Sequence, residues 1–245
     1  MKIKLNSKNY IDLNLLDEKK RDLILIFPGG GYEHTSSRES KPVSDVFLMD
    51  GYHTAIFYYR EEKLIFPTIH EEGLKVLETL RAHPSVGKIF LIGFSAGGHF
   101  ALMLAEFYPK LVDGTILAYP VISSDPSIYH GGSMRNLLGQ NLNEKTWEEV
   151  SLEKHVNEEM SPVFVMHTMD DQSVPVENSI RLIQALNQHQ IYNESHFYPR
   201  GNHGVSLATK EVAFESMDKN DFENQFGYIS SWIKLAKDFL ERIKK

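Results

Sequence analysis

A serine between two glycines stands where a buried strand would pass into a helix. Residues 93–97 read Gly-Phe-Ser-Ala-Gly, follow the apolar run 89–92 and open a stretch of helical periodicity. In that setting the pattern predicts a sharp turn that presents Ser95 as a nucleophile, with small neighbours because the backbone passes close to other segments. The helix behind the serine offers N–H groups to a developing anion. The alternative is a glycine-rich helix start in another α/β fold.

A second glycine-rich turn lies upstream, after the apolar run 23–27. It contains Gly29, Gly30 and Gly31 in succession. Three glycines let the backbone fold tightly and turn its N–H groups inward, as an oxyanion hole requires. A phosphate-binding loop is the rival interpretation, but the chain has neither the dinucleotide-binding glycine spacing nor the G-x-x-x-x-G-K-[ST] pattern. A loop without chemistry is the other alternative.

A serine hydroxyl needs a base to take its proton, and the base needs an orienting group. Among the eleven histidines we favour His203, because the loop 201–204 that carries it follows the last predicted core strand. His130 is its nearest rival. His99 lies one helical turn beyond the serine, so we expect it in helix packing. His34 either lines the pocket beside the glycines or lies near it without a role.

The orienting acid should follow a strand that lies between the serine and the histidine in the chain. Residues 163–167 supply such a strand, and Asp170 and Asp171 stand in the loop after it. The residue types alone do not separate the two aspartates, and adjacent aspartates are also frequent at helix starts. The chain order of serine, acid and histidine is that of the α/β-hydrolase fold.

Short apolar runs alternate with longer stretches of helical period and must position these groups. The predicted strands are mostly apolar throughout, as parallel strands covered on both faces are. They are 23–27, 54–59, 88–92, 114–119, 163–167 and 195–198. The predicted helices are 42–49, 70–82, 96–107, 176–190 and 228–243. This alternation predicts a mostly parallel sheet flanked by helices, to which the first twenty residues add an antiparallel edge strand or two.

The segment 123–160 interrupts this rhythm. Glycine, serine, asparagine and charged residues dominate it, and it lies between two predicted core strands. It is either an irregular connection over the sheet edge or a small polar lid. Because no linker divides the chain, we expect one domain over residues 1–245.

The composition excludes several classes of protein. The chain has 245 residues, of which 42% are hydrophobic and 24% charged, and a net charge of −7. An acidic chain of this kind is not expected to bind nucleic acid. With no cysteine it has no disulfide, thiolate nucleophile or zinc–thiolate site. Neither a signal sequence nor an apolar run long enough to span a membrane is present, so we expect a cytoplasmic protein.

Taken together, these pieces resemble the bacterial acetylesterase, or xylan-esterase-like, group of α/β-hydrolases, within the carboxylesterase and prolyl-oligopeptidase-related superfamily. The resemblance covers nearly the whole chain from residue 23 onward. Each of its motifs alone is a weak indication of the family, but together they are specific. They are 28–32, 38–39, 59–60, 93–99, 119–122, 137–139, 161–162, 167–175 and 201–204.

The resemblance implies a role for each site residue. In that group the acid stands four residues before the proline of D-x-x-V-P, which falls on Asp171. The oxyanion donors would be backbone N–H groups of Gly30 or Gly31 and of Ala96. The implied activity is hydrolysis of short-chain, acetyl-type carboxylic esters, such as acetylated carbohydrates, through an acyl-enzyme at Ser95.

Two other functions remain open. A prolyl-oligopeptidase-like serine peptidase would use the same three residues, and a non-catalytic binding module could share the scaffold. The expected partner is a small-molecule ester, and we expect neither a metal nor an organic cofactor. Oligomeric state is not indicated by the sequence.

Overall fold

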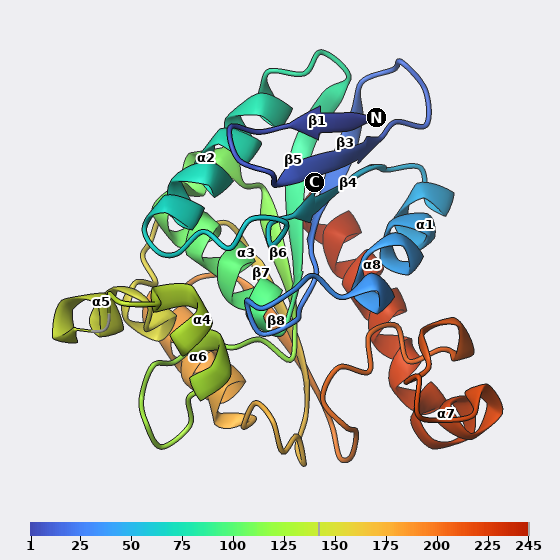
Figure 1. Cartoon of the computed structure of the whole chain (residues 1–245). Helices are drawn as coiled ribbons and strands as arrows, with labels where there is room; N and C mark the ends of the chain where they lie inside the picture. The colour runs from blue at the N-terminus through green and yellow to red at the C-terminus, as the bar shows by residue number, and fades with distance from the viewer. Residues whose placement is uncertain (142, 245) are drawn as a thin grey trace.

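In the computed structural model, which describes residues 1–141 and 143–244, eight strands form one sheet (Figure 1). They are β1 (Lys2–Lys4), β2 (Tyr10–Asn14), β3 (Arg21–Phe27), β4 (His53–Tyr58), β5 (Val86–Phe94), β6 (Gly114–Ala118), β7 (Val163–Thr168) and β8 (Asn193–Tyr198). Their order across the sheet is β1-β2-β4-β3-β5-β6-β7-β8. The pairs from β4 to β8 are parallel, and β1 and β2 add an antiparallel edge. The expected mostly parallel sheet and its antiparallel edge are confirmed.

Helices cover both faces of the sheet (Figure 1). They are α1 (Lys41–Met49), α2 (Thr68–Arg81), α3 (Ala96–Phe107), α4 (Gly131–Leu138), α5 (Glu144–Glu149), α6 (Glu177–Gln188), α7 (Lys219–Phe226) and α8 (Ser231–Ile243). One face carries α2, α3, α4 and α6, and the other carries α1, α7 and α8. All five predicted helices are present, with ends that differ by up to three residues.

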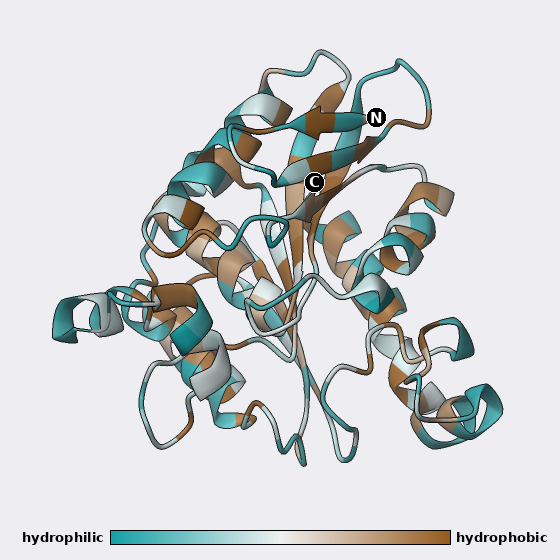
Figure 2. Ribbon diagram, in the orientation of Figure 1, coloured by the Kyte–Doolittle hydropathy of each residue, from teal (hydrophilic) through white to brown (hydrophobic). Residues whose placement is uncertain are grey.

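The strand β3 shows why the core strands are apolar throughout. Its side chains alternate between two hydrophobic clusters, with Leu23, Leu25 and Phe27 on one face and Ile24 and Ile26 on the other. Successive side chains of a strand point to opposite faces, so a strand buried on both faces needs apolar residues at every position. Figure 2 shows these apolar strands inside, with hydrophilic outer helix faces around them.

The segment 123–160 contains two helices that the sequence did not predict, α4 and α5. The segment is not simply an irregular connection, because several of its apolar side chains belong to the main core. These include Met134, Leu137, Val150 and Leu152. Residue 142 lies outside the described residues. The helix α7 was also missed, and it buries Phe222 and Phe226 against the other face.

Candidate active site

Ser95 occupies the sharp turn between β5 and α3 that the sequence predicts. Its backbone has φ 52° and ψ −120°, its N–H donates to the carbonyl of Ala118 at 3.0 Å, and the residue is 6% exposed. The flanking glycines leave room for this turn. A Cβ on Gly93 would lie 2.4 Å from the carbonyl oxygen of Gly97, and one on Gly97 would lie 2.1 Å from that of Phe27. Both glycines are therefore sterically required.

The side chains of Ser95, His203 and Asp171 form a continuous chain of hydrogen bonds. His203 Nε2 lies 2.8 Å from Ser95 Oγ, and His203 Nδ1 lies 2.7 Å from Asp171 Oδ2. In this arrangement Nδ1–H donates to the carboxylate, which leaves Nε2 to accept the serine proton. The three residues come from the loops after β5, β7 and β8, which meet at the carboxyl edge of the sheet.

Asp171 is held by the loop that follows β7. Its Oδ1 accepts the N–H groups of Ser173 and Val174 at 2.8 and 3.0 Å. Burial by itself raises the pKa of this carboxyl, but hydrogen bonds from His167 and His203 outweigh it and hold the pKa below its usual range. His167 Nε2 also donates to the Val174 carbonyl, which makes its second nitrogen an acceptor from Ser179. Asp171 is therefore ionised and fixed in orientation.

The neighbouring Asp170 has a different place. Its side chain is exposed, and its Oδ1 accepts the N–H of Gly201 at 2.7 Å. This bond ties the loop after β7 to the loop that carries His203. Of the two aspartates that the residue types left open, the geometry brings Asp171 to the histidine, as the resemblance implied.

The loop that contains Gly29, Gly30 and Gly31, here called the triple-glycine loop, packs directly against the turn at Ser95. A Cβ on Gly29 would lie 3.1 Å from the Ser95 Cβ, and Gly30 and Gly31 have φ values of 124° and 64°. Within the described part of the chain, the backbone N–H groups of Gly30, Gly31 and Ala96 have no acceptor. The loop that carries the predicted donors Gly30 and Gly31 thus borders the nucleophile, and the third predicted donor, Ala96, follows Ser95 directly in the chain.

Hydrogen bonds from other elements brace this loop. Tyr59 donates to the carbonyl of Pro28 at 2.5 Å, and Asn136 of α4 donates to the carbonyl of Gly31 at 2.9 Å. Tyr32 donates to Nδ1 of His99 at 2.9 Å. Nothing in the sequence marks Asn136, because its helix was not predicted.

The rival histidines occupy three different environments. His99 is fully buried, and its Nε2–H donates to the carbonyl of Val150, so it serves helix packing as expected. His130 caps α4, with Nδ1 accepting the N–H of Ser133. Its ring lies next to Gly31, and burial, followed by the nearby His203, lowers its pKa. His34 is exposed beside Gly30.

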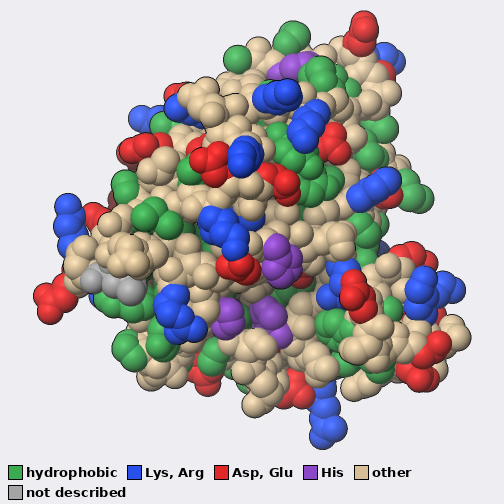
Figure 3. All heavy atoms as spheres, viewed as in Figure 1, with side chains coloured by type: hydrophobic (Ala, Val, Ile, Leu, Met, Phe, Trp, Pro, Cys, Tyr) green, Lys and Arg blue, Asp and Glu red, His purple; other side chains and the backbone are tan. Residues whose placement is uncertain are grey.

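A hollow of about 460 Å³ opens beside His203. Its other walls are mainly polar, with one aromatic ring: Asp170, Gln172, Ser173, Asn202, Phe214 and Ser216. Figure 3 shows several histidine side chains close together in the middle of the face in view. The site is thus open to a polar molecule next to the serine.

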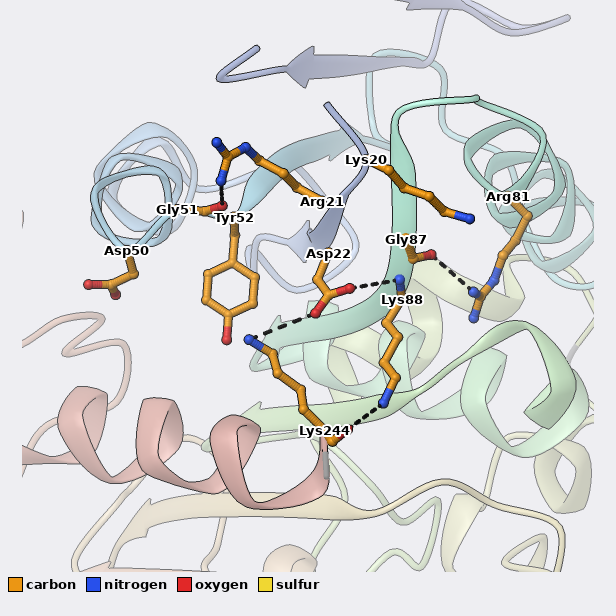
Figure 4. A pocket seen from close by; sticks show the side chains of 10 residues that line it. All are labelled: Lys20, Arg21, Asp22, Asp50, Gly51, Tyr52, Arg81, Gly87, Lys88 and Lys244. Atoms are coloured by element: carbon orange, nitrogen blue, oxygen red, sulfur yellow. Dashed lines mark hydrogen bonds and ion pairs between the residues drawn. The ribbon is translucent and has the colours of Figure 1, made fainter. Parts of the chain in front are cut away.

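A second hollow, of about 640 Å³, lies at the opposite edge of the sheet (Figure 4). It is bordered by residues at the starts of β3 and β5, including Arg21, Asp22 and Lys88. Two of its cations pair with carboxylates, Arg21 with Asp17 and Lys244 with Asp22, at 2.7 and 3.8 Å. This hollow is remote from Ser95 and takes no part in its chemistry.

The described residues hold neither a cluster suited to a metal ion nor a helix suited to a membrane. No group of three or more histidine, aspartate or glutamate side chains is arranged to hold a metal ion. Among the helices described, none combines the length and the apolar character that crossing a bilayer takes.

Two curated proteins similar to this chain are named as a xylanase and as an acetylxylan esterase. The chain is 31% identical over 217 residues to an endo-1,4-beta-xylanase B of Butyrivibrio fibrisolvens, covering 80% of this chain and 34% of the relative. It is 27% identical over 221 residues to an acetylxylan esterase of Xylanibacter ruminicola, and this match covers 80% of this chain and 46% of the relative. The chain therefore spans between a third and a half of the length of these relatives.

Among solved structures, an acetyl ester-xyloside bifunctional hydrolase of Caldicellulosiruptor lactoaceticus superposes with a TM-score of 0.83 at 28% identity. The match covers 98% of this chain and 90% of that one. It confirms the α/β-hydrolase fold. The model of the prolyl oligopeptidase family matches residues 71–226, a span that includes Ser95, Asp171 and His203. The chain belongs to the prolyl oligopeptidase family.

Proposed function

We propose that the chain is a serine hydrolase of carboxylic esters that carry short acyl groups. The observation that carries this proposal is the hydrogen-bonded chain from Asp171 through His203 to Ser95, with distances of 2.7 and 2.8 Å. It lies beside backbone N–H groups that have no other acceptor in the described residues. The relatives named as esterases support the same reaction.

The reaction proceeds in two displacements. Ser95 Oγ attacks the acyl carbonyl while His203 Nε2 takes its proton, and Asp171 stabilises the imidazolium that forms. The N–H groups of the triple-glycine loop and of Ala96 bind the oxyanion. His203 then gives the proton to the leaving alcohol, which departs and leaves the acyl group on Ser95. A water molecule, deprotonated by His203, releases the acid and restores the serine.

The hollow beside His203 supports a polar leaving group. Carboxylate, amide and hydroxyl side chains match the hydroxyls of an alcohol such as a sugar, and Phe214 offers an apolar face. The relatives named for acetylxylan and xyloside hydrolysis agree with this choice. We therefore propose acetylated carbohydrates, or similarly small polar esters, as the substrate class.

A test begins with a fluorophosphonate probe and the purified protein. We expect covalent labelling of wild-type protein at Ser95 and none of Ser95→Ala, and absence of labelling would mean that the chain is a binding module. A panel of matched esters and peptide amides follows. Faster cleavage of the amides than of the esters would identify the chain as a peptidase instead.

A further inference from the structure

A buried carboxylate that takes no part in the proposed reaction lies behind the triple-glycine loop. Glu39 is 3% exposed and ends a short 3-10 helix, Ser37–Glu39. One of its oxygens accepts the N–H of Gly29 at 2.8 Å, and the other accepts the hydroxyl of Tyr119 at 2.6 Å. A carboxylate costs free energy to bury unless it is well bonded, so its two partners are the reason that it is tolerated there.

Tyr119 extends this contact to the loop of the histidine. Its ring packs edge-on against the ring of His203, with centroids 5.1 Å apart and planes at 70°. Its hydroxyl oxygen accepts the N–H of Ser206 at 2.9 Å, three residues beyond the histidine. Tyr119 itself has φ 39°, a strained conformation that persists only where its surroundings enforce it.

The hydroxyl of Ser206 makes a second connection, to the 3-10 helix Ser37–Glu39. It donates to the carbonyl of Arg38 at 2.8 Å, next to Glu39 in the chain. The loop of His203 is therefore joined to the 3-10 helix that ends at Glu39 in two ways, directly through the Ser206–Arg38 bond and indirectly through the Tyr119 hydroxyl. The buried residues Glu39 and Tyr119 are bonded to each other. Glu39 contacts the triple-glycine loop and Tyr119 contacts the loop of His203.

We propose that Glu39 and Tyr119 are positioning residues, which set the oxyanion donors and the histidine at the correct distance from each other. This inference rests on the proposed function. The two loops must converge on one reacting carbonyl, and a displacement of about 1 Å costs on the order of a hundredfold in rate. A buried pair that only supported the fold would change stability and leave the turnover of folded protein unchanged.

The decisive variant is Tyr119→Phe, which keeps the ring against His203 and removes only the hydroxyl. We expect kcat for an acetyl ester to fall about 10- to 100-fold per folded site, with KM changed less than about threefold. The labelling rate with a fluorophosphonate should fall in parallel. Glu39→Gln, which keeps the shape, should lose a similar factor, and it carries the test if Tyr119→Phe fails to fold.

The matched control is Tyr52→Phe. Tyr52 is also buried, and its hydroxyl also donates to a glutamate, Glu241, at 3.1 Å, but at the opposite edge of the sheet (Figure 4). We expect unchanged kcat in this variant, even where the melting temperature falls as much as in Tyr119→Phe. A similar loss of kcat in the control would show that any lost buried hydroxyl has this effect, and would overturn the inference.

The double variant Glu39→Gln/Tyr119→Phe tests whether the pair acts as a unit. We expect its loss to lie within about twofold of the larger single loss, since residues in one network are not additive. Losses that multiply would contradict coupling, and folded Tyr119→Phe with wild-type kcat would reduce the pair to a structural role. If wild-type protein cleaves no ester, the proposed function is wrong, while the labelling rates still compare the variants.

Discussion

At the scale of single residues, the candidate site depends on positions with strict steric or hydrogen-bonding requirements. The turn at Ser95 has a positive φ, and Gly93 and Gly97 pass so close to other backbone atoms that neither could carry a Cβ. The carboxylate of Asp171 accepts from two backbone N–H groups and lies within hydrogen-bonding distance of two histidines. Substitutions at these positions should therefore separate chemistry from stability.

Ser95→Ala removes the nucleophile and little else. The hydroxyl is small, so its loss opens no large cavity, and we expect an unchanged melting temperature. Ester turnover should fall by about a thousandfold or more. The measurement is kcat/KM with p-nitrophenyl acetate. A variant that kept a tenth of wild-type turnover would place the nucleophile elsewhere.

Asp171→Asn and Asp170→Asn form a matched pair. Asn at 171 favours the wrong tautomer of His203, and by the precedent of serine proteases turnover should fall by about 10⁴. Asn at 170 keeps an oxygen that accepts the N–H of Gly201, so we expect less than about a tenfold loss. The ratio of the two kcat values decides the assignment, and the reverse ranking would contradict it.

Gly97→Ala tests the packing of the turn against β3. An added Cβ would lie 2.1 and 2.5 Å from the carbonyl oxygens of Phe27 and Pro28, and backbone cannot move aside cheaply. We expect a loss of about 1–3 kcal/mol or more in the free energy of unfolding. Gly227→Ala is the control, because its Cβ would meet its nearest atom at an ordinary 3.4 Å. Equal stability of the two variants in urea would refute the steric explanation.

At the scale of elements, α3 joins the nucleophile to the core through His99. The imidazole contacts Tyr32 of the triple-glycine loop on one side and Val150 of the segment 123–160 on the other. Burial lowers the pKa of His99 to about 4, and the Val150 hydrogen bond only partly opposes this shift. The folded protein therefore keeps this ring neutral where the unfolded chain would protonate it.

The sign of the resulting pH dependence follows from proton linkage. Between the unfolded pKa of 6.5 and the folded value of about 4, the unfolded chain binds the extra proton. Stability from neutral His99 is thus complete above pH 6.5 and is lost as the pH falls toward 4. From pH 7.5 to pH 5 the loss from this residue should be about 2 kcal/mol.

The measurement is the free energy of unfolding in urea at both pH values, for wild-type protein and for His99→Gln. The variant is expected to be less stable at pH 7.5 and to lose less stability on acidification. His189→Gln, at an exposed histidine after α6, should behave as wild type. An unchanged pH dependence in His99→Gln would mean that this ring is not the group responsible.

At the scale of the whole molecule, the parallel strands bring three distant loops to one edge of the sheet, and the hollow there is mainly polar. Several apolar side chains of the segment 123–160, among them Met134, Leu137 and Leu152, are buried in the core and so do not cover this hollow. We expect kcat/KM with p-nitrophenyl esters to peak at two to four acyl carbons and to fall clearly by eight. A peak at eight or more, or activation at a lipid interface, would identify a lipase.

EDTA should leave this activity unchanged, because the proposed reaction uses only side chains and backbone N–H groups. The control is a parallel assay with added zinc or manganese. A loss in EDTA that either metal restores would point to a metallohydrolase.

The six strands from β3 to β8, the five longer helices and the placement of Ser95 and His203 in loops after strands could all be predicted from the sequence alone. These features depend on local patterns: apolar runs, helical periodicity and glycines at tight turns. Short helices such as α4 and α7 were missed because their few turns give little periodicity, and distant contacts stabilise them.

The residue types left Asp170 and Asp171 as equal candidates for the acid, and the resemblance implied Asp171. The tertiary structure separates them by their contacts, since Asp171 meets His203 and Asp170 accepts the N–H of Gly201. The tertiary structure also brings together Glu39 and Tyr119, which are 80 residues apart in the chain. Such contacts arise where the carboxyl ends of non-consecutive strands converge. A linear pattern carries the residue types but not that convergence, which the crossover connections of the sheet create.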